Sequence, residues 1–149
     1  MLKKLFYLFL PLLSGSLIGL IISNFIDYGI LEKPFLSPPG FIFPIVWSLL
    51  YLLMGISYYL FKEKNPSETK LVNTIYYSQL IFNLLWSILF FVFKWRLFTI
   101  AWTIILVLLV IYLLYLFYEK SKISSYLNIP YLIWLIFATY LTIGIYVLN

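Results

Sequence analysis

A few polar and aromatic side chains stand inside long apolar runs of this sequence, and they are the residues best suited to bind a ligand. Gln79, Asn83 and Trp86 fall at positions i, i+4 and i+7, so they share one face of a helix. An amide that faced lipid would lack a hydrogen-bond partner, so we expect this face to point inward. It can serve hydrogen bonds between helices, the common role of such residues, or form the wall of a cavity that orients the polar edge of a ligand.

Two further pairs place aromatic rings near these amides. Trp47 and Tyr51 are four residues apart in one run, and Trp134 and Ala138 are four apart in another. If they turn inward, the two indoles form flat apolar walls suited to an aromatic ligand. If they turn outward near the ends of their runs, they belong to the aromatic belt at a membrane surface.

Several kinds of chemistry are excluded by composition. The chain has no cysteine and no histidine, and the apolar runs contain no Asp, Glu, Lys or Arg. Disulfides, thiolate nucleophiles, a histidine general base and Cys/His ligands to zinc or haem iron are therefore ruled out. The intramembrane charge that ion-coupled transporters keep is missing as well. We expect no metal and no cofactor, and binding rather than catalysis, with no nucleic acid as partner.

Five charge-free segments must position these residues in space. They are Leu5–Ile26, Pro34–Phe61, Leu71–Phe93, Leu97–Tyr118 and Ile123–Asn149. The chain is 64% hydrophobic and only 10% charged, and each segment exceeds the about 20 residues that a spanning helix needs. A barrel would instead show segments of about 10 residues with alternating polarity.

The sequence therefore predicts an all-α integral membrane bundle of five transmembrane helices in a single domain, residues 1–149, without an internal repeat. We expect the helices at about 5–26, 41–61, 71–93, 97–118 and 129–148. Short polar links, such as Lys62–Lys70 with its Asn65-Pro66 turn, predict that sequential helices are antiparallel neighbours.

The two ends of the predicted bundle carry unequal positive charge. One side holds seven Lys residues and the other holds three basic residues, Lys33, Lys94 and Arg96. The positive-inside rule then places the N-terminus in the cytoplasm and the C-terminus outside. Met1–Leu13 resembles a signal peptide in composition, but its apolar run continues to Ile26 without a small-x-small cleavage site, so we expect it to be the first spanning helix.

A proline-rich stretch separates the first two runs. Pro38, Pro39 and Gly40 cannot continue a helix, whereas Pro44 suits the first turn of the next one. Residues 27–40 should therefore form a stiff loop over one end of the bundle. It is either a plain connection or a lid over a pocket. Gly15 and Gly19 form a G-x-x-x-G pattern that allows close helix approach, within the bundle or between subunits.

Three stretches of the sequence resemble the TspO/MBR family, the tryptophan-rich sensory proteins and translocator proteins. They are EKPFLSPPGFIFPIVWSLLYLLMG (residues 32–55), NLLWSILFF (83–91) and PYLIWLIFATYLTIGIYVLN (130–149). The resemblance implies a homodimer of five-helix bundles with a cavity under the first loop. It also implies porphyrin or another tetrapyrrole as ligand. The pocket positions that carry over are Tyr28, Pro38, Trp47, Tyr51, Gln79, Asn83, Trp86, Trp134 and Ala138.

The resemblance also implies an alternative function and two departures. In some bacterial members the tryptophans matching Trp47 and Trp134 support light-driven oxidative breakdown of bound porphyrin, which would make these two the catalytic residues. Leu36 stands where the family usually has tryptophan, so we expect the lid to grip a flat ligand less well. No basic residue follows Tyr140, so the family's cholesterol-recognition stretch is incomplete and we do not expect steroid transport. A third alternative is a bundle without a ligand whose aromatic residues only pack.

Overall fold

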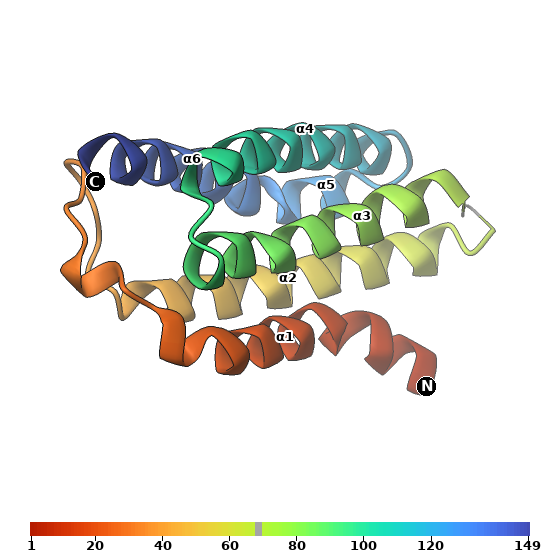
Figure 1. Ribbon diagram of the computed structural model, residues 1–149. Helices are drawn as coiled ribbons and strands as arrows, with labels where there is room; N and C mark the ends of the chain where they lie inside the picture. Colours follow the sequence, from red (N-terminus) through yellow and green to blue (C-terminus); the bar gives the residue numbers. More distant parts are fainter. Residues whose placement is uncertain (68–69) are drawn as a thin grey trace.

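Nearly the whole chain is helical, and the long helices run along one axis (Figure 1). A computed structural model describes residues 1–67 and 70–149, so part of the predicted loop Lys62–Lys70 lies outside the described residues. The elements are α1 (Leu2–Ile22), η1 (Ser23–Phe25), η2 (Tyr28–Ile30), α2 (Ile42–Lys64), α3 (Lys70–Ser87), η3 (Ile88–Val92), α4 (Arg96–Lys120), α5 (Lys122–Leu127) and α6 (Ile129–Leu148).

Five of the helical segments are long and apolar enough to cross a membrane. They are Leu2–Phe25, Ile42–Lys64, Lys70–Val92, Arg96–Lys120 and Lys122–Leu148. The predicted fold class is confirmed: the chain is a multi-pass membrane protein with five candidate spans. The helices α2 and α4 continue past the last apolar residue to Lys64 and Lys120, because lysine favours a helix and suits its C-terminal end.

The chain between α4 and α6 differs from the prediction of a simple loop. It forms the short helix α5, and Asn128 separates α5 from α6. The buried side chain of Asn128 donates from Nδ2 to Ser57 Oγ (2.6 Å) and to the carbonyl oxygen of Ser124 (3.2 Å). Pro130 then lies in the first turn of α6, where its missing N–H has no helical partner to lose.

The third span is also not one regular α-helix. Its last residues form the π-helical segment η3, in which the N–H of Phe93 donates to the carbonyl oxygen of Ile88 (3.1 Å). A π-helical turn changes the direction in which the following side chains point. Phe90 and Phe91 of this segment face the interior cavity described below.

The helices form a ring in which α1 lies beside α2 and α3, α3 beside α4, α4 beside α6, and α2 beside α5. The prediction that sequential helices are neighbours therefore holds for most links, whereas α2 and α3 meet through long side chains with their backbones farther apart. These two face each other across the interior, where Tyr58 Oη of α2 donates to Asn73 Oδ1 of α3 (2.6 Å). The ring of Tyr58 also stacks on that of Tyr76 of α3, with centroids 3.9 Å apart.

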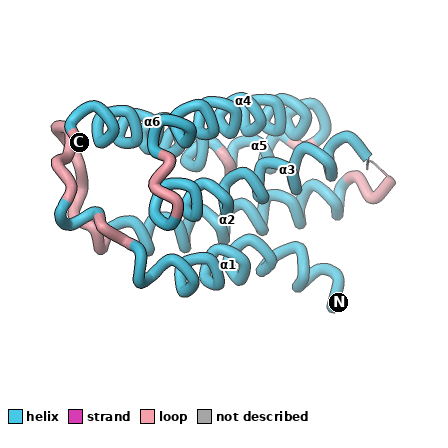
Figure 2. Tube along the Cα trace, in the orientation of Figure 1, coloured by secondary structure: helices cyan, strands magenta, loops and turns pink. Residues whose placement is uncertain are grey.

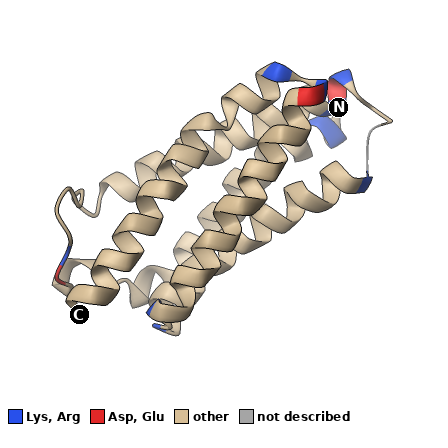
Figure 3. Ribbon diagram, turned by 90° about the horizontal axis from the view of Figure 1, so that it is seen from above, with Lys and Arg blue, Asp and Glu red and all other residues tan. Residues whose placement is uncertain are grey.

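Burial and charge follow the pattern of a protein in lipid. The interior is filled by a cluster that includes Met54, Tyr58, Phe61, Val110 and Phe117, each at most 1% exposed. Large apolar side chains are also exposed along all the spans. Figure 3 shows the charged residues gathered at the two ends of the bundle, with the length between them free of charge. Lipid covers this apolar length.

The segment between α1 and α2 crosses the end of the bundle beside the C-terminal end of α6 (Figures 1 and 2). We call residues 27–41 the lid. Pro34 packs against Gly144 of α6, where any side chain would overlap its ring. Tyr140 Oη donates to the carbonyl oxygen of Phe35 (2.7 Å), and Leu36 takes a left-handed backbone conformation (φ 71°). The lid is thus fixed to α6.

Candidate functional site

A cavity of about 440 Å³ lies inside the lid end of the bundle. Its walls come from α1, α2, α6, the end of the third span and the lid. No charged side chain stands among the described residues that line it, and its surface is mainly aromatic and aliphatic. Its size falls within the range of small-molecule sites in proteins, about 300–1,000 Å³.

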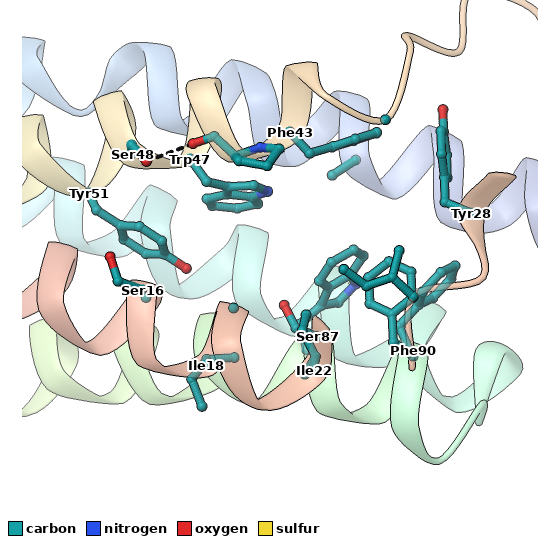
Figure 4. A pocket seen from close by; sticks show the side chains of 18 of the residues that line it. Ser16, Ile18, Ile22, Tyr28, Phe43, Trp47, Ser48, Tyr51, Ser87 and Phe90 are labelled. Atoms are coloured by element: carbon teal, nitrogen blue, oxygen red, sulfur yellow. Dashed lines mark hydrogen bonds between the residues drawn. The ribbon is translucent and has the colours of Figure 1, made fainter. Parts of the chain in front are cut away.

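One wall is an aromatic stripe on α2. Phe43, Trp47 and Tyr51 are four residues apart and therefore point to one side of the helix. The rings of Trp47 and Tyr51 stack with centroids 5.5 Å apart, and Phe43 meets Trp134 of α6 edge to face at 5.9 Å. Figure 4 shows this stripe on one side of the cavity, with Ile22 of α1 and Phe90 on the other. The space between these two walls is flat and apolar, and we call it the slot.

The end of the cavity farther from the lid is closed by a chain of buried hydrogen bonds. Tyr51 Oη donates to Asn83 Oδ1 (2.5 Å), and Asn83 Nδ2 donates to Tyr131 Oη (2.8 Å). Tyr131 Oη donates in turn to Gln79 Oε1 (2.9 Å), whose Nε2 lies 3.4 Å from Met54 Sδ. In lipid each of these groups needs such a partner, so the network holds the ring of Tyr51 in place.

The predicted site residues divide into two groups. Six of them line the cavity: Tyr28, Trp47, Tyr51, Trp86, Trp134 and Ala138. Gln79 is fully buried behind this wall, and Asn83 lines only a small void of about 10 Å³ between Trp47 and Trp86. Pro38 is not part of the lining, but its carbonyl oxygen holds Tyr28 in place. Direct contact of Gln79, Asn83 and Pro38 with a ligand stays a prediction.

The lid supplies one aromatic ring to the cavity. Tyr28 is 7% exposed, and its Oη donates to the carbonyl oxygen of Pro38 (2.7 Å). Burial raises the pKa of Tyr28 above its usual value, so the phenol keeps its proton and its hydrogen bond at neutral pH. Lys33 Nζ donates to the carbonyl oxygens of Tyr28 (3.0 Å) and Leu31 (2.8 Å), which further stiffens the lid.

Two indole N–H groups stand without a partner beside the cavity. Nε1 of Trp86 and Nε1 of Trp134 are both buried, and neither has a hydrogen-bond acceptor among the described residues. A buried donor without an acceptor costs about 1–3 kcal/mol. A ligand that placed a carbonyl, carboxylate or ring-nitrogen acceptor beside either indole would recover that free energy.

The contributions of α1 and of the π-helical segment η3 to the cavity were not predicted from the sequence. Gly15, Ser16 and Gly19 line the cavity, although their pattern suggested only close helix packing. Gly15 leaves room for the ring of Tyr51, which any side chain at that position would overlap. The roles of Phe90 and Phe91 depend on the π-helical turn, for which the sequence gives no signal.

An ion pair stands beside the cavity at the same end of the bundle. Asp27 at the start of the lid accepts from Arg96 Nη2 at the start of α4 (2.5 Å), and Lys94 Nζ lies 3.6 Å from the same carboxylate. The Arg96 guanidinium also lies 5.3 Å from the centroid of the Phe90 ring. This cluster ties the start of the lid to α4 and supports the aromatic wall from behind. Among the described residues, no group of three or more acidic side chains could hold a metal ion.

Comparison with known proteins gives consistent results. Residues 7–148 match the TspO/MBR family. The chain is 40% identical over 122 residues to a tryptophan-rich protein TspO of Archaeoglobus fulgidus, covering 82% of this chain and 79% of that protein. It is 33% identical to a tryptophan-rich sensory protein of Cereibacter sphaeroides (75% and 70% covered) and 32% identical to a translocator protein homolog of Schizosaccharomyces pombe (93% and 87% covered).

Proposed function

This chain belongs to the TspO/MBR family, and from that membership and the aromatic cavity we propose that it binds porphyrins or similar flat tetrapyrroles inside the membrane. The proposed ligand site is the slot between the α2 stripe, Trp86 and Trp134. Transport, sensing and sequestration all begin with this binding step. The observation that carries the proposal is a cavity of about 440 Å³ walled by aromatic rings.

The chemistry of the cavity suits a flat apolar ring with a few acceptors. Offset or edge-to-face contacts with Trp47, Phe43 and Trp134 favour an aromatic ligand by about 0.5–1.5 kcal/mol per pair beyond the area that is buried. The unpartnered indoles of Trp86 and Trp134 provide two donors. A bundle whose aromatic residues served packing alone would fill this space, because protein interiors are close-packed.

Quenching of tryptophan fluorescence by protoporphyrin tests the proposal. We expect saturable quenching in the wild type, and Trp134→Phe to weaken the affinity roughly fivefold to thirtyfold, because the smaller ring loses contact area and an N–H donor. Trp95→Phe is the matched control, since Trp95 is 55% exposed and lies outside the cavity lining. No quenching beyond that of an empty detergent micelle contradicts the proposal.

Light-driven oxidation of the bound pigment by dioxygen is a second candidate function. The observation in its favour is that Trp47 stacks on Tyr51 and meets Tyr131 at 6.3 Å, so an oxidised indole would have oxidisable phenols beside it. Illumination of the complex decides between binding and breakdown. If pigment absorbance decays at the same rate in the wild type and in the Trp47→Phe/Trp134→Phe variant, the two tryptophans have no such role.

We also propose that the protein is a homodimer, as its family membership suggests. The exposed apolar faces of the spans provide surface for a second copy. Chemical cross-linking of the protein in vesicles, repeated at rising ratios of lipid to protein, tests for the dimer. Protein that remains monomeric at every ratio contradicts the proposed homodimer.

A further inference from the structure

The cavity is open on one side of the bundle, between α1 and α2. Several residues that line it are also exposed on the outer surface, namely Ser16, Gly19 and Leu20 of α1 and Pro44 and Ser48 of α2. Leu20 is 74% exposed. All five lie within candidate spans, so the opening faces the hydrocarbon layer rather than water. Figure 4 shows Ser16 and Ser48 on the two helices that border it.

The spacing of α1 and α2 changes along their length. Near the far end the helices touch, because a side chain at Gly55 would overlap the backbone carbonyl of Leu8. In the middle, a side chain at Gly15 would overlap the ring of Tyr51. One turn further toward the lid, a Cβ at Gly19 would meet nothing within 4 Å. The gap therefore opens at Gly19, where the missing side chain leaves it clear.

The border of this gap is compatible with lipid and with an apolar ligand. The hydroxyl of Ser16 donates to the carbonyl oxygen of Leu12 (2.8 Å), and that of Ser48 donates to the carbonyl oxygen of Pro44 (2.7 Å). Both polar side chains are thus satisfied by their own helices, as groups in hydrocarbon must be. An apolar ring that passes between them breaks no hydrogen bond.

The lid, by contrast, is held against α6 and the C-terminal residue by several contacts. The side-chain amide of Asn149 forms two hydrogen bonds with the backbone of Glu32, accepting from its N–H (3.1 Å) and donating to its carbonyl oxygen (2.8 Å). Tyr140 holds Phe35, and Pro34 is seated on Gly144. Passage under the lid would break these contacts together, whereas passage between α1 and α2 breaks none of them.

We propose that the ligand reaches the cavity from within the bilayer, through the gap between α1 and α2, and that Gly19 sets the width of this route. The inference rests on the proposed function, since it concerns the same cavity. Flat apolar ligands concentrate in the hydrocarbon layer, because burial of apolar surface drives them out of water. A side opening lets the protein collect them there without exposing the site to water.

The kinetics of protoporphyrin binding to the protein in lipid vesicles test the route. Gly19→Leu narrows the gap, and the Cβ of the new side chain would meet no other atom within 4 Å. We expect the association and dissociation rates both to fall by about tenfold, with less than a threefold change in Kd, because obstruction of a route slows passage in both directions. Gly29→Leu in the lid is the matched control, since a Cβ there also meets nothing within 4 Å. Gly19→Ala should lie between the wild type and Gly19→Leu.

A second arm loosens the lid through Asn149→Ala. If the ligand enters between the helices, this variant keeps the wild-type association rate within about twofold. The proposal is overturned if Asn149→Ala speeds association while Gly19→Leu does not slow it. It is also overturned if Gly19→Leu only speeds dissociation, because that result means that the leucine occupies the ligand site. Absence of binding in the wild type would instead refute the proposed function, which separates the two failures.

Discussion

Asn83 is the residue that most clearly links the stability of the bundle to its proposed site. Its amide joins Tyr51 of the aromatic stripe to Tyr131 of α6, and through Tyr131 to Gln79. A ligand in the cavity would therefore meet the ring of Tyr51, which Asn83 holds, before it met Asn83 itself. Two roles were predicted for the helix face that carries Gln79 and Asn83, namely hydrogen bonds between helices and a cavity wall. Asn83 makes such hydrogen bonds, and through them it positions a residue of the cavity wall.

This arrangement predicts how Asn83→Ala behaves. We expect it to lower the free energy of unfolding by about 1–2 kcal/mol, because it leaves the buried hydroxyl of Tyr51 without a partner and removes one of the two hydrogen bonds of Tyr131. Ser16→Ala, which removes a hydroxyl bonded only within its own helix, is the control. Denaturation in mixed micelles of rising SDS content measures both variants.

A double-mutant cycle with Tyr51→Phe separates positioning from direct contact. If Asn83 acts through Tyr51, the two substitutions weaken protoporphyrin binding by similar factors and their combination adds little. Fully additive losses would mean that Asn83 contacts the ligand on its own, contrary to the geometry described above.

At the scale of elements, the lid and its contact with α6 make the clearest prediction. Because both backbone groups of Glu32 bond to Asn149, a glutamate-specific protease should cut slowly after Glu32 in the wild type. Asn149→Ala removes both bonds, and we expect cleavage there to rise by about fivefold to thirtyfold, the equivalent of 1–2 kcal/mol.

Asn149→Asp provides a graded comparison at the same position. It removes the bond donated to the Glu32 carbonyl oxygen, so its cleavage rate should be higher than that of the wild type. Equal cleavage in all three proteins would show that the lid is held by other contacts, such as those of Pro34 and Tyr140.

The elements also show what could be predicted from sequence. The five spans follow from apolar length alone, and the start of α2 follows from Pro38, Pro39 and Gly40. The start of the last helix at Ile129 agrees with the prediction, but the short helix α5 before it was not predicted, because Ser57, which is distant in sequence, holds Ser124 and Asn128 there. The π-helical turn and the Asn149 contact were missed for the same reason: tertiary contacts decide them, and no local pattern records them.

The candidate site shows the same limit. Residues on a single helix face, such as Trp47 with Tyr51 and Trp134 with Ala138, could be placed together from their spacing. The cavity itself could not, because it exists where α1 diverges from α2 near Gly19. Spacing along one helix says nothing about the distance between two.

For the whole molecule, the orientation in the membrane stays a prediction from the lysine count. The chain lacks cysteine, so single cysteines can report on each end without further substitutions. In intact cells, an impermeant thiol reagent added outside should label Lys33→Cys in the lid and leave Lys64→Cys at the end of α2 unlabelled. The reverse pattern would invert the orientation and place the lid in the cytoplasm.

The central claim is that a flat pigment lies in the aromatic slot under the lid, and a structure of the protoporphyrin complex tests it most directly. We predict a ring between Trp47, Trp86 and Trp134, with an acceptor of the ligand within hydrogen-bond distance of at least one of the two indoles that now lack a partner. A pigment bound on the outer surface of the spans, with the slot empty or filled by side chains, would contradict the account.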